Sequence, residues 1–88
     1  MNIAIGQAVV SKRGRDAGKP FVVLDVFGEY LFLADGDSRL IAKPKKKKDR
    51  HVQPVNKFFD FSSVAGRKLN DADIRKYIKN EICKKGEV

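Results

Sequence analysis

Two short segments of the sequence concentrate side chains that bind phosphate. Residues 12–19 carry four cations on what is predicted to be one short loop. Residues 43–50 hold five lysines and one arginine against one aspartate, a net charge of +5. Such groups neutralise phosphates and release bound counterions, which is typical of nucleic-acid contacts. The alternative for either segment is a solvated surface, but the second is internal and flanked by apolar residues that predict ordered structure.

His51 adjoins the second segment and is either a packed residue or an accessory contact to RNA. Most aromatic residues lie in apolar strand contexts, which favour a core role. Tyr30 and Phe58 are the candidates for an exposed base-stacking platform. The full set of residues predicted to contact RNA is Lys12, Arg13, Arg15, Lys19, Lys43, Lys45, Lys46, Lys47, Lys48, Arg50 and His51.

The sequence offers no pattern for catalysis, a metal ion or a cofactor. Between Gly14 and Gly18 lie three residues, and Pro20 follows Lys19, whereas a P-loop needs four residues and then Lys with Ser or Thr. A better interpretation is that Gly18 adopts a positive φ before the next strand. There is no Ser/His/Asp or Cys/His arrangement and no spacing that builds a metal site. We expect a protein that is not an enzyme and has no cofactor.

The overall charge supports an anionic partner. The chain has 19 Lys and Arg against 11 Asp and Glu, giving +8. Residues 1–42 carry five of each sign, so residues 43–88 supply the whole excess with fourteen against six. Such asymmetry indicates a binding surface rather than uniform solubilisation.

The same composition predicts a soluble protein of the cytoplasm. Cys83 is the single cysteine, so no disulfide forms within the chain. Residues 1–10 lack the basic start and long apolar run of a signal peptide. No stretch approaches 18 apolar residues.

Apolar runs bounded by glycine and proline predict a small antiparallel β-barrel. The chain is 88 residues long, which suits one structural domain. The predicted strands are residues 6–11, 21–27, 30–34 and 39–42, with 51–55 as a short closing strand or turn. The basic run at 43–50 is expected to be a loop or a strand extension in solvent.

A C-terminal helix is predicted from Asn70 to Gly86. Asn70 is a favourable N-cap, and Asp73 three residues later makes the start resemble a capping box. Ile74, Ile78 and Ile82 form one apolar stripe that is expected to cover the barrel. Residues 58–61 are an aromatic cluster predicted to plug an open edge. We assign the barrel to residues 1–66 and the helix to residues 67–88.

Several of these segments together resemble the KOW family of RNA-binding domains. The similar residues are 6–11 and 14–19, followed by the apolar strand 21–27. Residues 39–54 and 69–77 are similar to the branch that contains the fourteen-e type proteins of the large ribosomal subunit. The resemblance implies an SH3-like barrel that binds RNA, often ribosomal RNA, with Gly18 as the family's glycine after the first strand and basic loops at 12–19 and 43–50.

The sequence thus predicts a ribosome-associated or translation-related protein that contacts structured RNA without base-specific chemistry. A different class remains open, because KOW barrels also dock proteins. The partner would then be a transcription or translation factor or another acidic protein, bound by the helix stripe or by residues 58–61. Membrane attachment is disfavoured because the helix lacks a broad apolar face.

Overall fold

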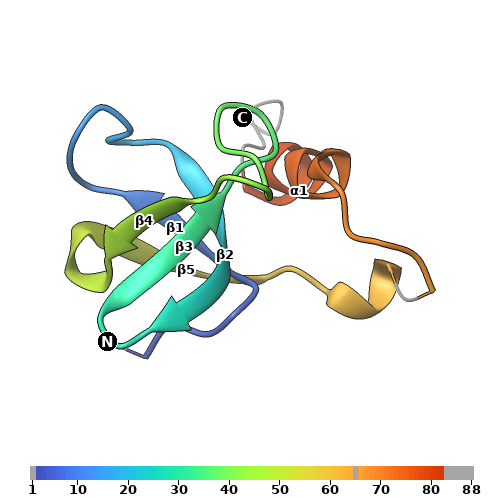
Figure 1. Cartoon of the computed structure of the whole chain (residues 1–88). Helices are drawn as coiled ribbons and strands as arrows, with labels where there is room; N and C mark the ends of the chain where they lie inside the picture. Colours follow the sequence, from blue (N-terminus) through green and yellow to red (C-terminus); the bar gives the residue numbers. More distant parts are fainter. Residues whose placement is uncertain (1, 65, 83–88) are drawn as a thin grey trace.

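A five-stranded antiparallel sheet dominates the computed structural model, which describes residues 2–64 and 66–82 (Figure 1). The strands are β1 (Gln7–Ser11), β2 (Pro20–Phe27), β3 (Tyr30–Ala34), β4 (Lys45–Lys48) and β5 (Val52–Phe58). Their order is β4-β3-β2-β1-β5, and every neighbouring pair is antiparallel. The predicted mainly β, SH3-like class with a C-terminal helix is confirmed. In the described residues the sheet does not close between its edge strands β4 and β5.

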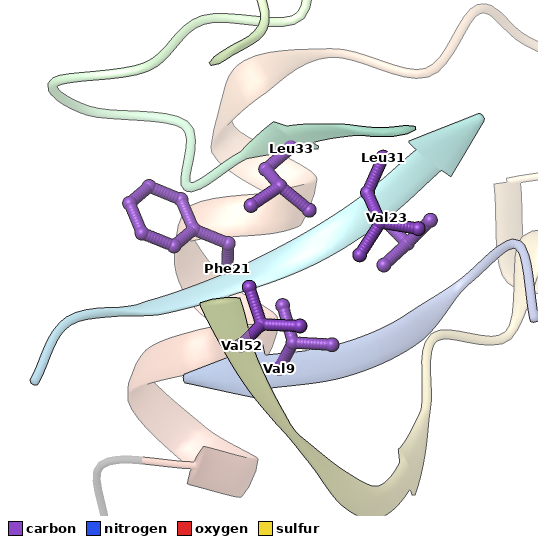
Figure 2. Close-up of a cluster of buried hydrophobic side chains, with 6 residues drawn as sticks. All are labelled: Val9, Phe21, Val23, Leu31, Leu33 and Val52. Atoms are coloured by element: carbon purple, nitrogen blue, oxygen red, sulfur yellow. The ribbon is translucent and has the colours of Figure 1, made fainter. Parts of the chain in front are cut away.

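One face of the sheet holds the central apolar core (Figure 2). Its buried side chains are Val9, Phe21, Val23, Leu31, Leu33 and Val52, which come from four strands. Side chains at i and i+2 of a strand point to the same face, which is why alternate residues of β3 contribute. A fully buried side chain of this kind contributes roughly 1.5–3 kcal/mol relative to an exposed one. The cluster therefore holds the curled sheet together.

The helix covers one end of the opposite face. It comprises α1 (Asp71–Tyr77) and a following π-helical turn, η3 (Ile78–Ile82). The buried side chains of this second cluster are Val22, Phe59, Val64, Ile74 and Ile78. The predicted stripe is thus confirmed in two positions, and Ile82 is half-buried against the same cluster. Among the described residues no helix is long and apolar enough to cross a membrane.

The helix begins with the predicted capping box. Asn70 accepts a hydrogen bond from the Asp73 backbone at 3.0 Å, and the Asp73 carboxylate accepts one from the Asn70 backbone at 3.0 Å. Arg67 donates two more to that carboxylate, at 2.9 and 2.7 Å. The hydrogen bonds from Arg67 and from the Asn70 backbone lower the pKa of Asp73 to about 2. The predicted helix end at Gly86 lies outside the described residues, as does Cys83.

The predicted fourth strand needs correction. Residues 39–42 do not form a strand; the Lys43 backbone donates to the Leu40 carbonyl at 3.0 Å, which closes a turn. The fourth strand is instead β4, inside the basic run; of the two alternatives predicted for that run, a loop or a strand extension in solvent, the strand is the one that forms, and three of its four lysines are partly buried. Four consecutive lysines have low strand propensity, but at a sheet edge their long side chains can reach solvent or polar partners while the backbone pairs.

The aromatic cluster at 58–61 divides into one buried ring and two exposed ones. Phe59 is buried and packs edge-to-face on Tyr77 and Phe61, at 5.4 and 5.1 Å between ring centroids. Phe58 and Phe61 remain 52% and 38% exposed. The plug is therefore Phe59 alone, and β5 runs three residues beyond its predicted end at Val55. The boundary between residues 66 and 67 stays a prediction.

Candidate nucleic-acid interface

The four lysines of β4 alternate between the two faces of the sheet. The cross-strand partners are Leu33 for Lys45, Phe32 for Lys46, Leu31 for Lys47 and Tyr30 for Lys48. Directly paired residues of an antiparallel ladder share a face. Lys45 and Lys47 therefore lie on the core side, with their stems over buried leucines. Lys46 and Lys48 lie on the outer side.

Lys47 connects β4 to the first basic loop. Its Nζ lies 2.8 Å from Ser11 Oγ and 2.8 Å from the Arg13 carbonyl oxygen. The Ser11 hydroxyl donates to the same carbonyl at 3.0 Å. Burial lowers the pKa of Lys47, and the neighbouring charge of Lys45 lowers it further. This side chain fixes the loop against the strand.

Asp16 ties the same two segments together from the buried side. Only 4% of Asp16 is exposed. Its carboxylate lies 3.2 Å from Arg39 Nη2, 3.3 Å from Lys45 Nζ and 4.0 Å from Lys19 Nζ. Burial alone would raise the pKa of Asp16, but hydrogen bonds from Lys45 and Arg39 outweigh burial and lower it. The ionised carboxylate thus anchors the loop to β4 and to the turn at Arg39.

Sequence reasoning missed the role of Asp16. The available signal was its position as the single acid of a loop with four cations, between two glycines. Both Gly14 and Gly18 have positive φ, at 79° and 86°, so the prediction for Gly18 is confirmed. The Gly18 backbone donates to the Ser11 carbonyl at 2.8 Å, which folds the loop back on β1.

Two hollows that share Arg13 and His51, together called the basic groove, bring both segments to one surface. The first, about 430 Å³, is lined by Arg13, Gly14, Tyr30, Lys45, Lys46, Lys47, Lys48 and His51. The second, about 480 Å³, is lined by Lys12, Arg13, Arg50 and His51. The Lys12 backbone donates to the His51 carbonyl at 2.8 Å, which joins the loop to the short 3-10 helix η1 (Asp49–His51).

His51 sits at the centre of this positive field. Its partial burial lowers its pKa, and the nearby charges of Arg13, Arg50, Lys47 and Lys48 lower it further. The same cations therefore disfavour the imidazolium form in the free protein, and they favour binding of an anion. A phosphate placed among these cations would reverse the balance and favour the imidazolium.

The residues predicted to contact RNA do not all line the basic groove. Arg15, Lys19 and Lys43 are outside the groove. Lys19 lines a separate hollow with Arg75 and Lys79 of the helix. Contact of RNA with any of the predicted residues stays a prediction. In the described part of the chain, no group of three or more His, Cys, Asp or Glu side chains is placed to hold a metal ion.

Besides Phe61, a second aromatic residue was wrongly expected to be buried. Phe27, expected in the core, is 64% exposed at the end of β2. Tyr30, a predicted stacking candidate, is half-buried beneath Lys46, whose Nζ lies 4.5 Å from the ring centroid.

The curled sheet and the basic groove define a small SH3-like β protein with a concave cationic surface. The chain is similar to archaeal proteins named large ribosomal subunit protein eL14. The relative from Staphylothermus marinus is 29% identical over 79 residues, which cover 89% of this chain and 78% of the relative. The relative from Saccharolobus solfataricus is 24% identical over 86 residues, covering 91% and 90%. The resemblance to the fourteen-e type is thus confirmed; no protein-family model matches the chain.

Proposed function

We propose that this chain is a non-catalytic RNA-binding protein that contacts folded ribosomal RNA and acts on the ribosome, in the cytoplasm. The observation that carries the proposal is the meeting of Arg13 with the β4 lysines in one hollow of the basic groove, with Arg50 in the other hollow, which shares Arg13 and His51. The similarity to large ribosomal subunit proteins over nearly the whole chain supports the choice of RNA and argues against an enzyme.

The groove binds through charge and shape. Lysine ammonium groups act as point charges on phosphates and carry little sequence information. Arg13 and Arg50 add planar donors that match phosphate oxygens in pairs. Folded RNA offers closely spaced phosphates and exposed loops, so a concave cationic surface selects it by its shape.

The lysines of β4 have a second physical role, because charged residues on an edge strand prevent pairing with another sheet. That role needs no groove and no other element. Arg13 is outside β4 yet lines the hollow of the β4 lysines, and Lys12 and Arg50 line the second hollow, which shares Arg13 and His51 with the first. Their placement favours phosphate binding over edge protection alone.

A salt titration tests the proposal. Affinity for a folded ribosomal-RNA fragment is measured against salt, with duplex DNA and an acidic protein as competitors. We expect a log–log slope of about −4 to −7, because each phosphate contact contributes close to one unit. A shallow slope, or equal competition by every polyanion, would reject the proposal.

A charge-reversal pair locates the surface. Arg13→Glu with Arg50→Glu reverses two exposed groove cations, and Lys57→Glu with Lys68→Glu reverses two exposed lysines outside it. Both doubles lower the net charge from +8 to +4, since each substitution removes two units and each double variant carries two substitutions. The groove double should lose far more affinity than its control. Equal losses would mean that only net charge matters.

A protein-docking role is the second candidate. The exposed rings of Phe58 and Phe61 favour it. The burial of Ile74 and Ile78 argues against the helix stripe as its contact surface. If the protein has that role, Phe58→Ala should weaken the binding of an acidic protein measured without RNA and leave the affinity for RNA unchanged.

A further inference from the structure

The outer face of the sheet carries a row of aromatic side chains at the end away from the helix. Phe27 pairs with Tyr30, and Tyr30 pairs with Lys48 across the next ladder. Phe32 is two residues beyond Tyr30 and pairs with Lys46. Because paired residues share a face, three rings and two lysines occupy one side of β2, β3 and β4. Figure 1 shows this hairpin end lying far from α1.

Phe27 is the accessible ring of this row, and its neighbours hold it in place. Phe27 is 64% exposed, while Tyr30 and Phe32 are half-buried. Phe27 packs edge-to-face on Phe32 at 5.8 Å between centroids and 90° between planes, so one ring supports the other. An exposed, oriented ring on a rigid hairpin keeps its π face available at little cost in conformational entropy.

The aromatic row continues into the basic groove. Tyr30 lines the groove beside the β4 lysines. The Nζ atoms of Lys46 and Lys48 lie 4.5 and 5.9 Å from the Tyr30 ring centroid. Without an anion these cations rest on the ring. A phosphate in the groove would draw them off it and uncover the tyrosine.

We propose that Phe27 and Tyr30 form a stacking platform for an unpaired nucleotide whose flanking phosphates lie against Lys46 and Lys48. This inference rests on the proposed function and names the RNA feature that is recognised. Bases in a continuous duplex have both faces stacked, whereas a bulge or loop offers a free base. Rings beside cations that follow the backbone are the arrangement that binds single-stranded segments.

Charge decides between a nucleotide and a protein as the occupant. Lys46 and Lys48 border the rings on the β4 side, which suits a polyanion and disfavours an apolar protein surface. The negative charge of Asp25 lies on the same face, but Asp25 pairs with Phe32 and is therefore further from the hairpin end than Phe27 and Tyr30. Its carboxylate also accepts a hydrogen bond from the Val26 backbone at 2.9 Å.

The test uses a tryptophan placed in the platform. The chain has no tryptophan, so Phe27→Trp and, as a matched control, Phe58→Trp each give one fluorophore at an exposed phenylalanine. Each variant is titrated with a dye-labelled RNA hairpin bearing a one-nucleotide bulge and with the same hairpin fully paired. Dye anisotropy reports binding, and tryptophan emission reports stacking.

We expect the bulged hairpin to quench Phe27→Trp but not Phe58→Trp. Phe27→Ala should weaken binding to the bulged hairpin about tenfold and hardly affect the paired one, since stacking on one ring is worth about that factor. Phe58→Ala should change neither.

Three outcomes would overturn the platform. If anisotropy shows salt-sensitive binding while Phe27→Trp emission stays constant, the platform is wrong and the proposed function stands. If neither hairpin binds in a salt-sensitive manner, the proposed function fails and the platform with it. If Phe27→Trp emission changes with protein concentration alone, the face associates with a second copy instead.

Discussion

The Lys47 ammonium nitrogen lies 2.8 Å from the carbonyl oxygen of Arg13, a residue 34 positions earlier in the chain. This contact joins two basic segments whose side chains repel one another. Lys47 therefore uses its charge to build the groove, while its exposed neighbour Lys46 keeps its charge available for a ligand.

Replacing Lys47 with Met should lower the free energy of unfolding by about 1 kcal/mol, because the stem is retained but hydrogen bonds to Arg13 and Ser11 are lost. Lys46→Met removes the same charge from an exposed position and should change it by less than about 0.5 kcal/mol. Urea unfolding measures both. Equal stabilities would show that the Lys47 contact does not hold the loop.

Asp16→Asn should weaken RNA binding although it makes the protein more basic. Its net charge rises from +8 to +9, yet the loop loses the carboxylate that holds Lys45 and Arg39. We expect a loss of about 1–3 kcal/mol in stability. Asp37→Asn, at an exposed turn position, adds the same charge and should not lower RNA affinity. If Asp16→Asn bound RNA more tightly, net charge alone would govern the interaction.

The elements that residue patterns predicted well are those with strong local signals. β3 begins at Tyr30 and ends at Ala34 as predicted, because a continuous apolar run and the Gly28 turn define it. The helix start at Asn70 follows from capping chemistry that depends on four adjacent residues. Both arise from contacts within a few positions, which a sequence displays directly.

The interior of the groove depended on long-range contacts. A run of lysines does not predict a strand from local preferences. β4 forms because its backbone pairs with β3, which a sequence does not display. Asp16 meets Arg39 and Lys45 only after the sheet has formed. Phe27 looked like core because its strand is apolar, but the helix covers only the other end of that face.

Lower pH should strengthen RNA binding through His51, the single histidine of the chain. Its pKa is lowered in the free protein by burial and by Arg13, Arg50 and Lys47, among other cations. A bound phosphate would raise that pKa, so the complex takes up a proton; affinity then increases as the pH falls from the raised pKa of the complex towards the lowered pKa of the free imidazole, and levels off below it. Affinities at constant ionic strength between about pH 8 and pH 5.5 measure the effect. His51→Gln should give a flat profile; an unchanged slope would assign the proton to another group.

Gly36→Ala should lower the stability of the protein far more than the same substitution at another glycine with a positive φ. Gly36 has a φ of +77°, and an added Cβ would overlap the Asp71 carbonyl oxygen and lie 2.8 Å from the Arg75 backbone nitrogen. The positive φ costs about 1 kcal/mol and the overlap about 1–3 kcal/mol more. Arg75 also donates to the Gly36 carbonyl at 2.7 Å, so the turn and the helix must separate together.

Gly28→Ala provides the matched control, because Gly28 has a φ of +60° and nothing within 4 Å of its added Cβ. It should lose about 1 kcal/mol from backbone strain alone. Thermal unfolding of the two variants then compares backbone strain alone, in Gly28→Ala, with backbone strain and steric overlap together, in Gly36→Ala. Equal losses of stability in the two variants would mean that the helix can shift to make room for a methyl group without cost. The packing of Ile74 and Ile78 would then not fix the position of the helix on the sheet.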